Sequence, residues 1–123
     1  LMSFSGRWCG EYRPHRSPWM VGSSVVENRS GRTSHDRVPV LCCGTDGFSE
    51  ETGEVWGLHL GWSGNSRVNA EVTLDGTRHV QLGELLLPGE MVLGPGETYG
   101  SPWVFGAYSA AGASNASSSR STI

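Results

Sequence analysis

Large apolar residues alternate with small or polar residues over much of the chain, a period of two that predicts β-strands. In the clearest run, residues 56 to 62, every second position is large and apolar: Trp56, Leu58, Leu60 and Trp62. The positions between them are Gly57, His59 and Gly61. Because successive side chains of a strand point to opposite faces, we expect the four large residues to face a core. The two glycines should leave room on the other face.

Two further alternating runs predict a β-hairpin over residues 68 to 82. The first run ends at Leu74, the second begins at Arg78, and Asp75 and Gly76 lie between them. Asp-Gly is a strong signal for a type I′ turn, in which both central residues need a positive φ. We therefore expect a tight hairpin with this pair at its tip.

The remaining apolar runs are also short and bounded by turn-forming residues. Residues 38–43 and 102–109 each predict a strand, and no window has the period of a helix. Many short strands at this spacing favour an all-β fold, an antiparallel β-sandwich, over alternating helices and strands. We expect residues 1–109 to form this sandwich. Residues 110–123 are small, polar and without pattern, and they are expected to form a low-complexity disordered tail.

Charge is distributed unevenly along the 123 residues. The nine basic residues are all arginines, and against 12 acidic residues they leave a net charge of −3. Six of the arginines lie in residues 1–37 with only three acidic residues, so this part is near +3. No aromatic RNA-binding signature and no DNA-reading helix accompany these arginines, and we therefore expect no nucleic-acid partner.

The cysteines and histidines give no metal or disulfide pattern. Cys9, Cys42 and Cys43 are odd in number and lack a Cys-x-x-Cys spacing, and the four histidines lack the spacing of metal ligands. We expect three buried thiols, no metal and no cofactor. The chain has no signal-peptide pattern and no apolar stretch of about 18 residues, so we expect no membrane insertion and a cytoplasmic location.

Four segments, taken in order, resemble one protein family. They are GRWCGEYRP (6–14), ENRSGRTSHDRVP (27–39), VWGLHLGWSGNSR (55–67) and GELLLPGEMVLGPGETYGSPWVFGAYS (83–109). They look like the amino-terminal β-sandwich domain of glycoside hydrolase family 36, the α-galactosidases, especially those of actinobacterial type. The resemblance runs from about Leu1 to Ser109 and implies a partial sandwich of the supersandwich type.

The resemblance implies a parent enzyme that hydrolyses terminal α-galactose from galactosides such as melibiose and raffinose by a retaining mechanism. That mechanism needs two carboxyl groups about 5 Å apart. The family carries both on a following (β/α)₈ barrel, with the nucleophile in a Lys-Trp-Asp motif. The present sequence has no lysine and no Trp-Asp pair, and such a barrel takes about 250 residues. A non-catalytic fragment is therefore expected, truncated before the barrel and preceded in relatives by further strands.

The family also indicates where this domain meets a substrate. In tetrameric relatives one of its loops reaches the neighbouring subunit's active site, and the matching loop here is GRTSHDRVP. Asp36 and Arg37 are the best candidates for sugar contacts, because a carboxylate accepts hydrogen bonds from hydroxyl groups and a guanidinium donates to two oxygens. Arg32 and His35 are further candidates at this subunit interface. The family pattern is Gly-Asp-Phe-Arg-x-Pro, so either Asp36 or Arg37 can match the family residue. The pair can also serve only to order the loop.

Two other residues have a structural and a functional interpretation. Trp19 lies in an expected loop, where its ring could stack on a sugar or join the core. Asn65, after Gly64, is expected to be a turn residue with left-handed φ, and the alternative is a contact with ligand. The implied partners are α-galactoside sugars and further copies of the chain in a homo-oligomer. A stand-alone carbohydrate-binding or structural β-sandwich is the alternative function.

Overall fold

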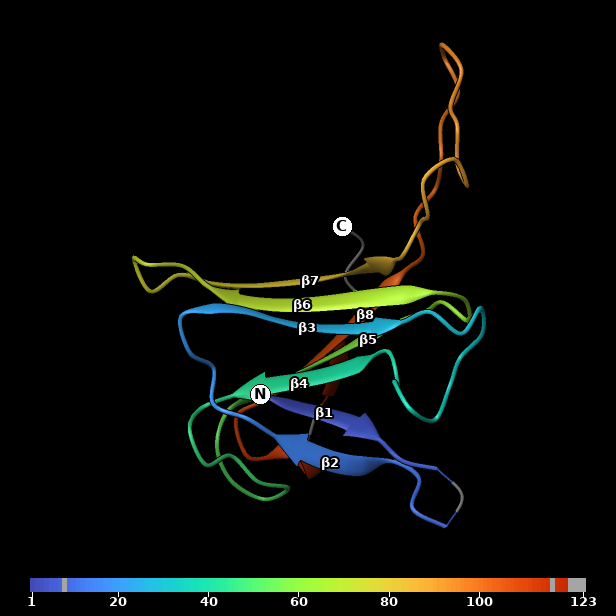
Figure 1. The fold of residues 1–123 in the computed structure, drawn as a ribbon. Coiled ribbons are helices and arrows are strands. Elements are labelled where there is room, and N and C mark those ends of the chain that lie inside the picture. Colours follow the sequence, from blue (N-terminus) through green and yellow to red (C-terminus); the bar gives the residue numbers. More distant parts are fainter. Residues whose placement is uncertain (8, 116, 120–123) are drawn as a thin grey trace.

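The computed structural model describes residues 1–7, 9–115 and 117–119, which contain nine β-strands (Figure 1). They are β1 (Met2–Ser5), β2 (Arg13–Arg16), β3 (Gly22–Asn28), β4 (Val40–Gly44), β5 (Val55–Leu60), β6 (Ser66–Val72), β7 (Arg78–Glu84), β8 (Val104–Ser109) and β9 (Ser117–Ser119). A short 3₁₀ helix, η1 (Ala113–Asn115), precedes β9. No helix in the described part of the chain is long and apolar enough to cross a membrane.

The strands form two antiparallel sheets. The larger sheet has six strands in the order β2-β1-β4-β5-β8-β9, and the smaller has three in the order β3-β6-β7. The smaller sheet lies across one side of the larger one, above β4 and β1 in the view of Figure 1. The described residues contain no α-helix, so the predicted all-β antiparallel sandwich is confirmed.

The main core lies between the two sheets. Leu41 of β4 packs with Val68 and Ala70 of β6, and all three side chains are buried. Every second residue of β6 is buried, as its alternating sequence predicts. Leu58 of β5 is opposite Leu41 in register and therefore lies on the same face of the larger sheet.

A smaller cluster lies on the other face of the six-stranded sheet. Met2, Val55 and Phe48 are buried together there. Phe48 comes from the loop between β4 and β5, and it fits because Gly44 has no side chain. A Cβ at Gly44 would lie 2.9 Å from the Phe48 ring. The loop after β4 thus closes this face of the sheet.

The apolar stripe of β5 is only partly buried. Leu60 is 1% exposed, whereas Trp56 and Trp62 are 42% and 39% exposed, so the expectation of a fully buried stripe is wrong for both tryptophans. Trp56 packs against the ring of Tyr108 at a centroid distance of 5.3 Å instead. Trp62 follows the end of the strand and covers Gly64, where a Cβ would lie 2.7 Å from the indole nitrogen.

Gly57 within β5 and Gly61 just after it have different surroundings. A Cβ at Gly57 would have only Cys42 Sγ near it, at 4.0 Å, so the expected open space is present there. Gly61 instead lies against β8, where a Cβ would be 2.9 Å from the Phe105 ring. The expectation of room at Gly61 is therefore wrong, because a neighbouring aromatic side chain fills it.

β6 and β7 form the predicted hairpin, but its turn is of another type. Gly76 N donates to Thr73 O and Thr73 N donates to Thr77 O, which leaves a three-residue loop. Gly76 has a φ of 86°, whereas Cys9 and Tyr12 are the only non-glycine residues with positive φ in the described ranges. Asp75 Oδ1 accepts hydrogen bonds from Thr73 Oγ1 and Thr77 N, and this favours a type I turn followed by a left-handed glycine over type I′.

Residues 110–115 and 117–119 belong to the segment expected to be a disordered tail, and hydrogen bonds and strand pairing join them to the sandwich. Gly112 N donates to Gly53 O, Ala113 N donates to Ser49 O, and β9 pairs with β8. The close approach requires a glycine, since a Cβ at Gly112 would lie 2.4 Å from Glu50 O. Residues 116 and 120–123 of the predicted tail lie outside the described residues.

The three cysteines are free and differ in burial. Cys43 is buried and Cys42 half-buried, but Cys9 is exposed, so the expectation of buried thiols is wrong there. Burial raises the pKa of the Cys42 and Cys43 thiols.

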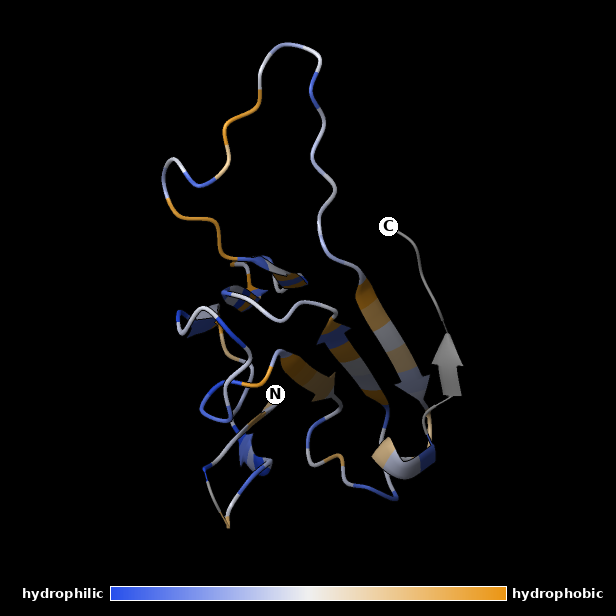
Figure 2. Ribbon diagram, turned by 90° about the vertical axis from the view of Figure 1, so that its right-hand side faces the viewer, coloured by the Kyte–Doolittle hydropathy of each residue, from blue (hydrophilic) through white to orange (hydrophobic). Residues whose placement is uncertain are grey.

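Between β7 and β8 the chain forms a long arm, residues 85–103, that has no strand or helix. The arm projects far beyond both sheets before the chain returns to β8 (Figures 1 and 2).

Candidate functional site

The candidate loop is taken as residues 29–37, the segment after β3 that contains residues 31–37 of GRTSHDRVP, and two asparagines hold its first half. Asn28 is 3% exposed. It makes three hydrogen bonds: Nδ2 to Arg32 O (2.7 Å), Nδ2 to Gly64 O (3.4 Å), and Ser30 N to Oδ1 (3.1 Å). Asn65 Oδ1 accepts from Gly31 N at 2.8 Å. Asn65 therefore acts through its side chain, and the expected left-handed φ is wrong.

The second half of the loop is a turn fixed to the end of β1. Arg37 N donates to Ser34 O at 3.3 Å, and Asp36 N donates to Ser34 Oγ at 3.1 Å. Gly6 N donates to His35 O at 2.8 Å. The backbone that carries Asp36 and Arg37 is thus fixed to the six-stranded sheet, on which loop residues can hold a defined geometry.

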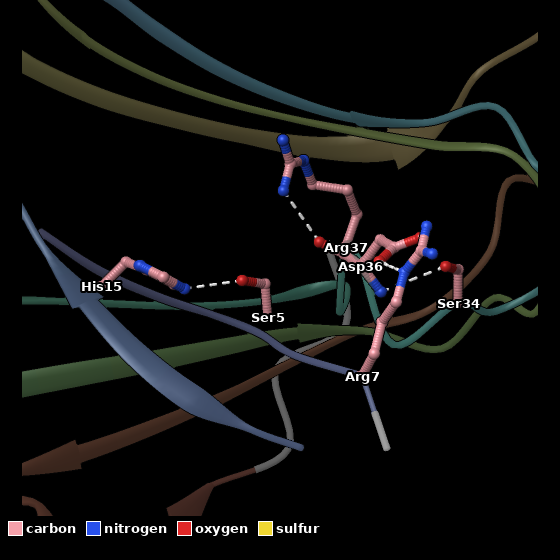
Figure 3. Close-up of polar contacts among 6 residues, drawn as sticks. All are labelled: Ser5, Arg7, His15, Ser34, Asp36 and Arg37. Carbon is pink, nitrogen blue, oxygen red and sulfur yellow. Dashed lines mark hydrogen bonds and ion pairs between the residues drawn. The ribbon is translucent and has the colours of Figure 1, made fainter. Parts of the chain in front are cut away.

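The carboxylate of Asp36 forms a two-point ion pair with Arg7 (Figure 3). Arg7 Nε lies 2.7 Å from Oδ1, and Nη2 lies 2.9 Å from Oδ2. This hydrogen bonding lowers the pKa of Asp36, so the carboxyl group is ionised at neutral pH. A carboxylate has about four acceptor sites, and Arg7 occupies two of them. Asp36 can therefore still accept hydrogen bonds from a ligand.

Arg37 donates from Nη1 to the backbone oxygen of Asp36 at 2.8 Å, and it borders a cleft of about 250 Å³. Residues of β1, β2 and β3 form the rest of this cleft. At its rim Ser5 Oγ and His15 Nε2 form a hydrogen bond of 2.6 Å (Figure 3). The cleft combines hydroxyl, imidazole and guanidinium groups, which suits a ligand with several hydroxyl groups.

The four candidates of the loop lie within residues 32–37, and Trp19 lies at a different cleft. Arg32 and His35 are exposed residues, and their backbone oxygens accept the bonds that hold the loop. Trp19 packs against the Leu41 cluster and borders a different, larger cleft of about 890 Å³. The guanidinium of Arg78 lies 5.8 Å from the centroid of its ring. Trp19 thus packs partly against the core and partly lines this cleft.

Sequence reasoning did not single out Arg7, Ser5 or His15, which lie at the site. The spacing between Arg7 and Asp36 is 29 residues, so only the pairing of β1 with β4 brings them together. In the part of the chain that the structure describes, no group of three or more histidine, cysteine, aspartate or glutamate residues could hold a metal ion.

Solved structures with the same fold are glycoside hydrolases. The α-galactosidase AgaA from Geobacillus stearothermophilus superimposes with a TM-score of 0.81 and 32% identity, over 90% of this chain and 16% of that one. The galactosidase domain of the α-galactosidase–sucrose kinase AgaSK has a TM-score of 0.78 and 29% identity, over 90% and 15% of the two chains. The fold is therefore that of an accessory β-sandwich in this class of enzyme.

The sequence identifies the family. Residues 1–94 match the model of the glycosyl hydrolase family 36 N-terminal domain, and the chain belongs to that family. An α-galactosidase from Escherichia coli is 50% identical over 112 residues, which are 91% of this chain and 16% of that enzyme. AgaA is 33% identical over 104 residues, 85% of this chain and 14% of that enzyme. The chain thus spans about a sixth of the length of these relatives.

Proposed function

We propose that this chain is the non-catalytic amino-terminal part of an α-galactosidase that removes terminal α-galactose from galactosides such as melibiose and raffinose. The observation that carries the proposal is the 50% identity to the E. coli α-galactosidase over 91% of the chain. A variant of AgaA has been solved in complex with raffinose, which supports this class of substrate.

The chemistry is assigned to a part of the enzyme outside this chain. Retaining hydrolysis needs a nucleophile and an acid/base carboxyl group about 5 Å apart. The sequence lacks the Lys-Trp-Asp nucleophile motif of the family, and the described residues form a sandwich and not a barrel. The domain then contributes binding and assembly.

The loop at residues 29–37 is the proposed contact with substrate, in the active site of a neighbouring copy within a homo-oligomer. Asp36 is ionised and has free acceptor sites, and Arg37 uses one of its five N–H groups for the backbone of Asp36. Both groups suit sugar hydroxyls. Arg7 would hold the carboxylate in a fixed orientation, and Arg32 and His35 would line the same interface.

A chimeric enzyme tests this function. The matching segment of the E. coli α-galactosidase is replaced by this chain, and release of nitrophenol from nitrophenyl α-galactoside is measured. We expect turnover by the chimera and none by the isolated chain. A folded chimera without turnover would contradict the proposal, and so would turnover by the isolated chain.

One observation favours the second candidate, a carbohydrate-binding module. The cleft of about 890 Å³ contains Trp19, Trp56 and two arginines, Arg16 and Arg78. An exposed tryptophan face beside guanidinium groups is a surface on which a sugar ring can stack. Titration of the isolated chain with raffinose, followed by tryptophan fluorescence, tests this alternative. Saturable binding that Trp56→Ala abolishes would support it.

A further inference from the structure

The arm, residues 85–103, exposes large apolar side chains, most of them on the leg that leaves β7, whose apolar residues are orange in Figure 2. They include Leu87 (46% exposed), Met91 (40%), Val92 (78%), Leu93 (50%) and Trp103 (62%). Single exposed apolar residues are normal on a protein surface, but a continuous set of them marks an interaction site.

Two turns of the same construction shape the arm. Residues 87–90 and 94–97 each have proline second, glycine third with a φ of 81° or 84°, and glutamate fourth. In each turn the glutamate N–H donates to the first residue's oxygen, and the glutamate Oε2 accepts from the first residue's N–H at 2.8 Å. A segment ordered in this way loses less conformational entropy on binding.

The two legs of the arm form no backbone hydrogen bonds with each other. Within residues 85–103, the only backbone hydrogen bonds between arm residues are those that close the two turns. The peptide groups of residues 91–93 and 98–102 are therefore free to pair with another surface. Apolar side chains and unpaired peptide groups in one segment are the features that a docking element needs.

We propose that the arm docks into an apolar groove on the remaining part of the same α-galactosidase molecule. The inference rests on the proposed function, because the relatives are about six times as long as this chain and offer the surface to cover the arm. Each arm carries Glu90 and Glu97, and no basic residue lies between residues 80 and 119, so two paired arms would both be negatively charged. Charge thus disfavours pairing of arms and favours a groove elsewhere in the enzyme.

Oxidation of methionine measures whether the arm is covered. Met91 lies in the arm, and Met20, 70% exposed, lies in the sandwich and serves as the reference in the isolated chain. We expect peroxide to oxidise both at similar rates in the isolated chain, and Met91 at least tenfold more slowly in the chimera. An unchanged rate for Met91 would overturn the proposal. Protection that appears in the isolated chain as its concentration rises would also overturn it, since the occupant would be a second copy.

A pair of variants gives an independent measurement. Val92→Ser with Leu93→Ser should lower the melting temperature of the chimera, while Leu74→Ser, 95% exposed at the tip of the β6–β7 hairpin, should not. Neither change should affect the isolated chain. Equal shifts in the chimera would contradict docking.

The outcomes separate the inference from the proposed function. A folded chimera that hydrolyses nothing but protects Met91 would contradict the proposed function and support the docking of the arm. An active chimera in which Met91 is oxidised as fast as in the isolated chain would support the function and contradict the docking. If the chimera does not fold, residues 85–103 alone are grafted into the E. coli enzyme. Failure of this graft to fold or to protect Met91 overturns the proposal, because a fit to that surface is what it claims.

Discussion

The candidate loop and the arm are both irregular segments, but they are ordered by different parts of the molecule. The loop, residues 29–37, is held by the buried Asn28, by Asn65 and by the chain after β1. The arm is held by its own two turns and bonds to the sandwich only near its ends, through Leu85, Trp103 and the hydroxyl of Tyr99. A segment fixed to a sheet can place charged groups accurately, whereas a self-contained segment can project apolar groups to a partner.

The largest expected effect is on catalysis, through the loop. Asp36→Ala and Arg37→Ala in the active chimera should each lower kcat/KM about ten- to hundredfold with little change in melting temperature, because each would remove a proposed charged hydrogen bond to the sugar. The matched control is Arg29→Ala, since Arg29 lies in the same loop and bonds only to Glu27 in the described structure. Kinetics and oligomer mass are measured together. Lower stability or lost assembly with normal kinetics in the folded fraction would assign the pair to ordering the loop.

The anchoring of the loop can be broken at Asn28. Asn28→Ala removes three hydrogen bonds at a buried position and should lower the free energy of unfolding by about 2 kcal/mol. Asn115→Ala, an exposed asparagine with one bond to Ala111 O, is the control and should have little effect. Urea unfolding of the isolated chain measures both. Similar midpoints for the two variants would show that the loop is not anchored as described.

Glycine substitutions separate the two segments. Gly31 in the loop and Gly89 in the arm have φ values of 72° and 81°, and a Cβ at either would contact nothing within 4 Å. Gly31→Val should lower global stability by about 1 kcal/mol, because a β-branched residue resists positive φ and the loop is tied to the sheets. Gly89→Val should melt the arm alone and leave the unfolding midpoint unchanged. Hydrogen exchange of the arm amides with urea unfolding tests both, and equal losses of stability would contradict the distinction.

The smallest effect is the pH dependence of the loop. Arg7 lowers the folded-state pKa of Asp36. The ion pair therefore stabilises the fold above the pKa that Asp36 has in the unfolded chain, and this stabilisation is lost as pH falls through the folded-state pKa of Asp36. An NMR titration should find the pKa of Asp36 below the ordinary value of about 3.9, and Arg7→Gln should bring it back toward that value. Asp75, whose pKa is lowered to about 2 chiefly by its hydrogen bond from Thr73, should be unaffected by that change. An Asp36 that titrates alike in both proteins would exclude the ion pair.

Strands with an apolar alternation could be predicted from the sequence. β5, β6 and β7 fall on alternating runs, and β4 and β8 fall on the short apolar runs at residues 38–43 and 102–109. β2 and β3 do not, because RPHR and GSSVVEN have no apolar alternation, and β1, MSFS, alternates over only four residues. They are strands because β1 pairs with β4, β2 pairs with β1, and β3 pairs with β6. The prediction that Trp56 and Trp62 are buried was wrong for a related reason. Alternation in the sequence indicates which face of a strand a side chain lies on, but not how far the other sheet covers that face.

The site could be predicted in part. The resemblance placed the loop with its four candidates within residues 32–37, and Trp19, grouped with them as a candidate, borders a different cleft. Their sugar contacts stay a prediction. The partner of Asp36 could not be found from spacing, because Arg7 is brought to it by strand pairing, and the turn at Asp75 depends on side-chain bonds that compete with the backbone preference of Asp-Gly.

The edges of the two sheets have a consequence for handling the isolated chain. β2, at one edge of the larger sheet, is four residues long and carries Arg13, Pro14 and Arg16, which discourage the addition of another strand. Both edges of the smaller sheet, β3 and β7, are seven residues long, and Gly22 to Val26 in β3 carry no charge. Aggregation of the purified chain should therefore begin by edge-to-edge addition at β3. A lysine in place of the exposed Val25 is the substitution with which to keep the protein in solution.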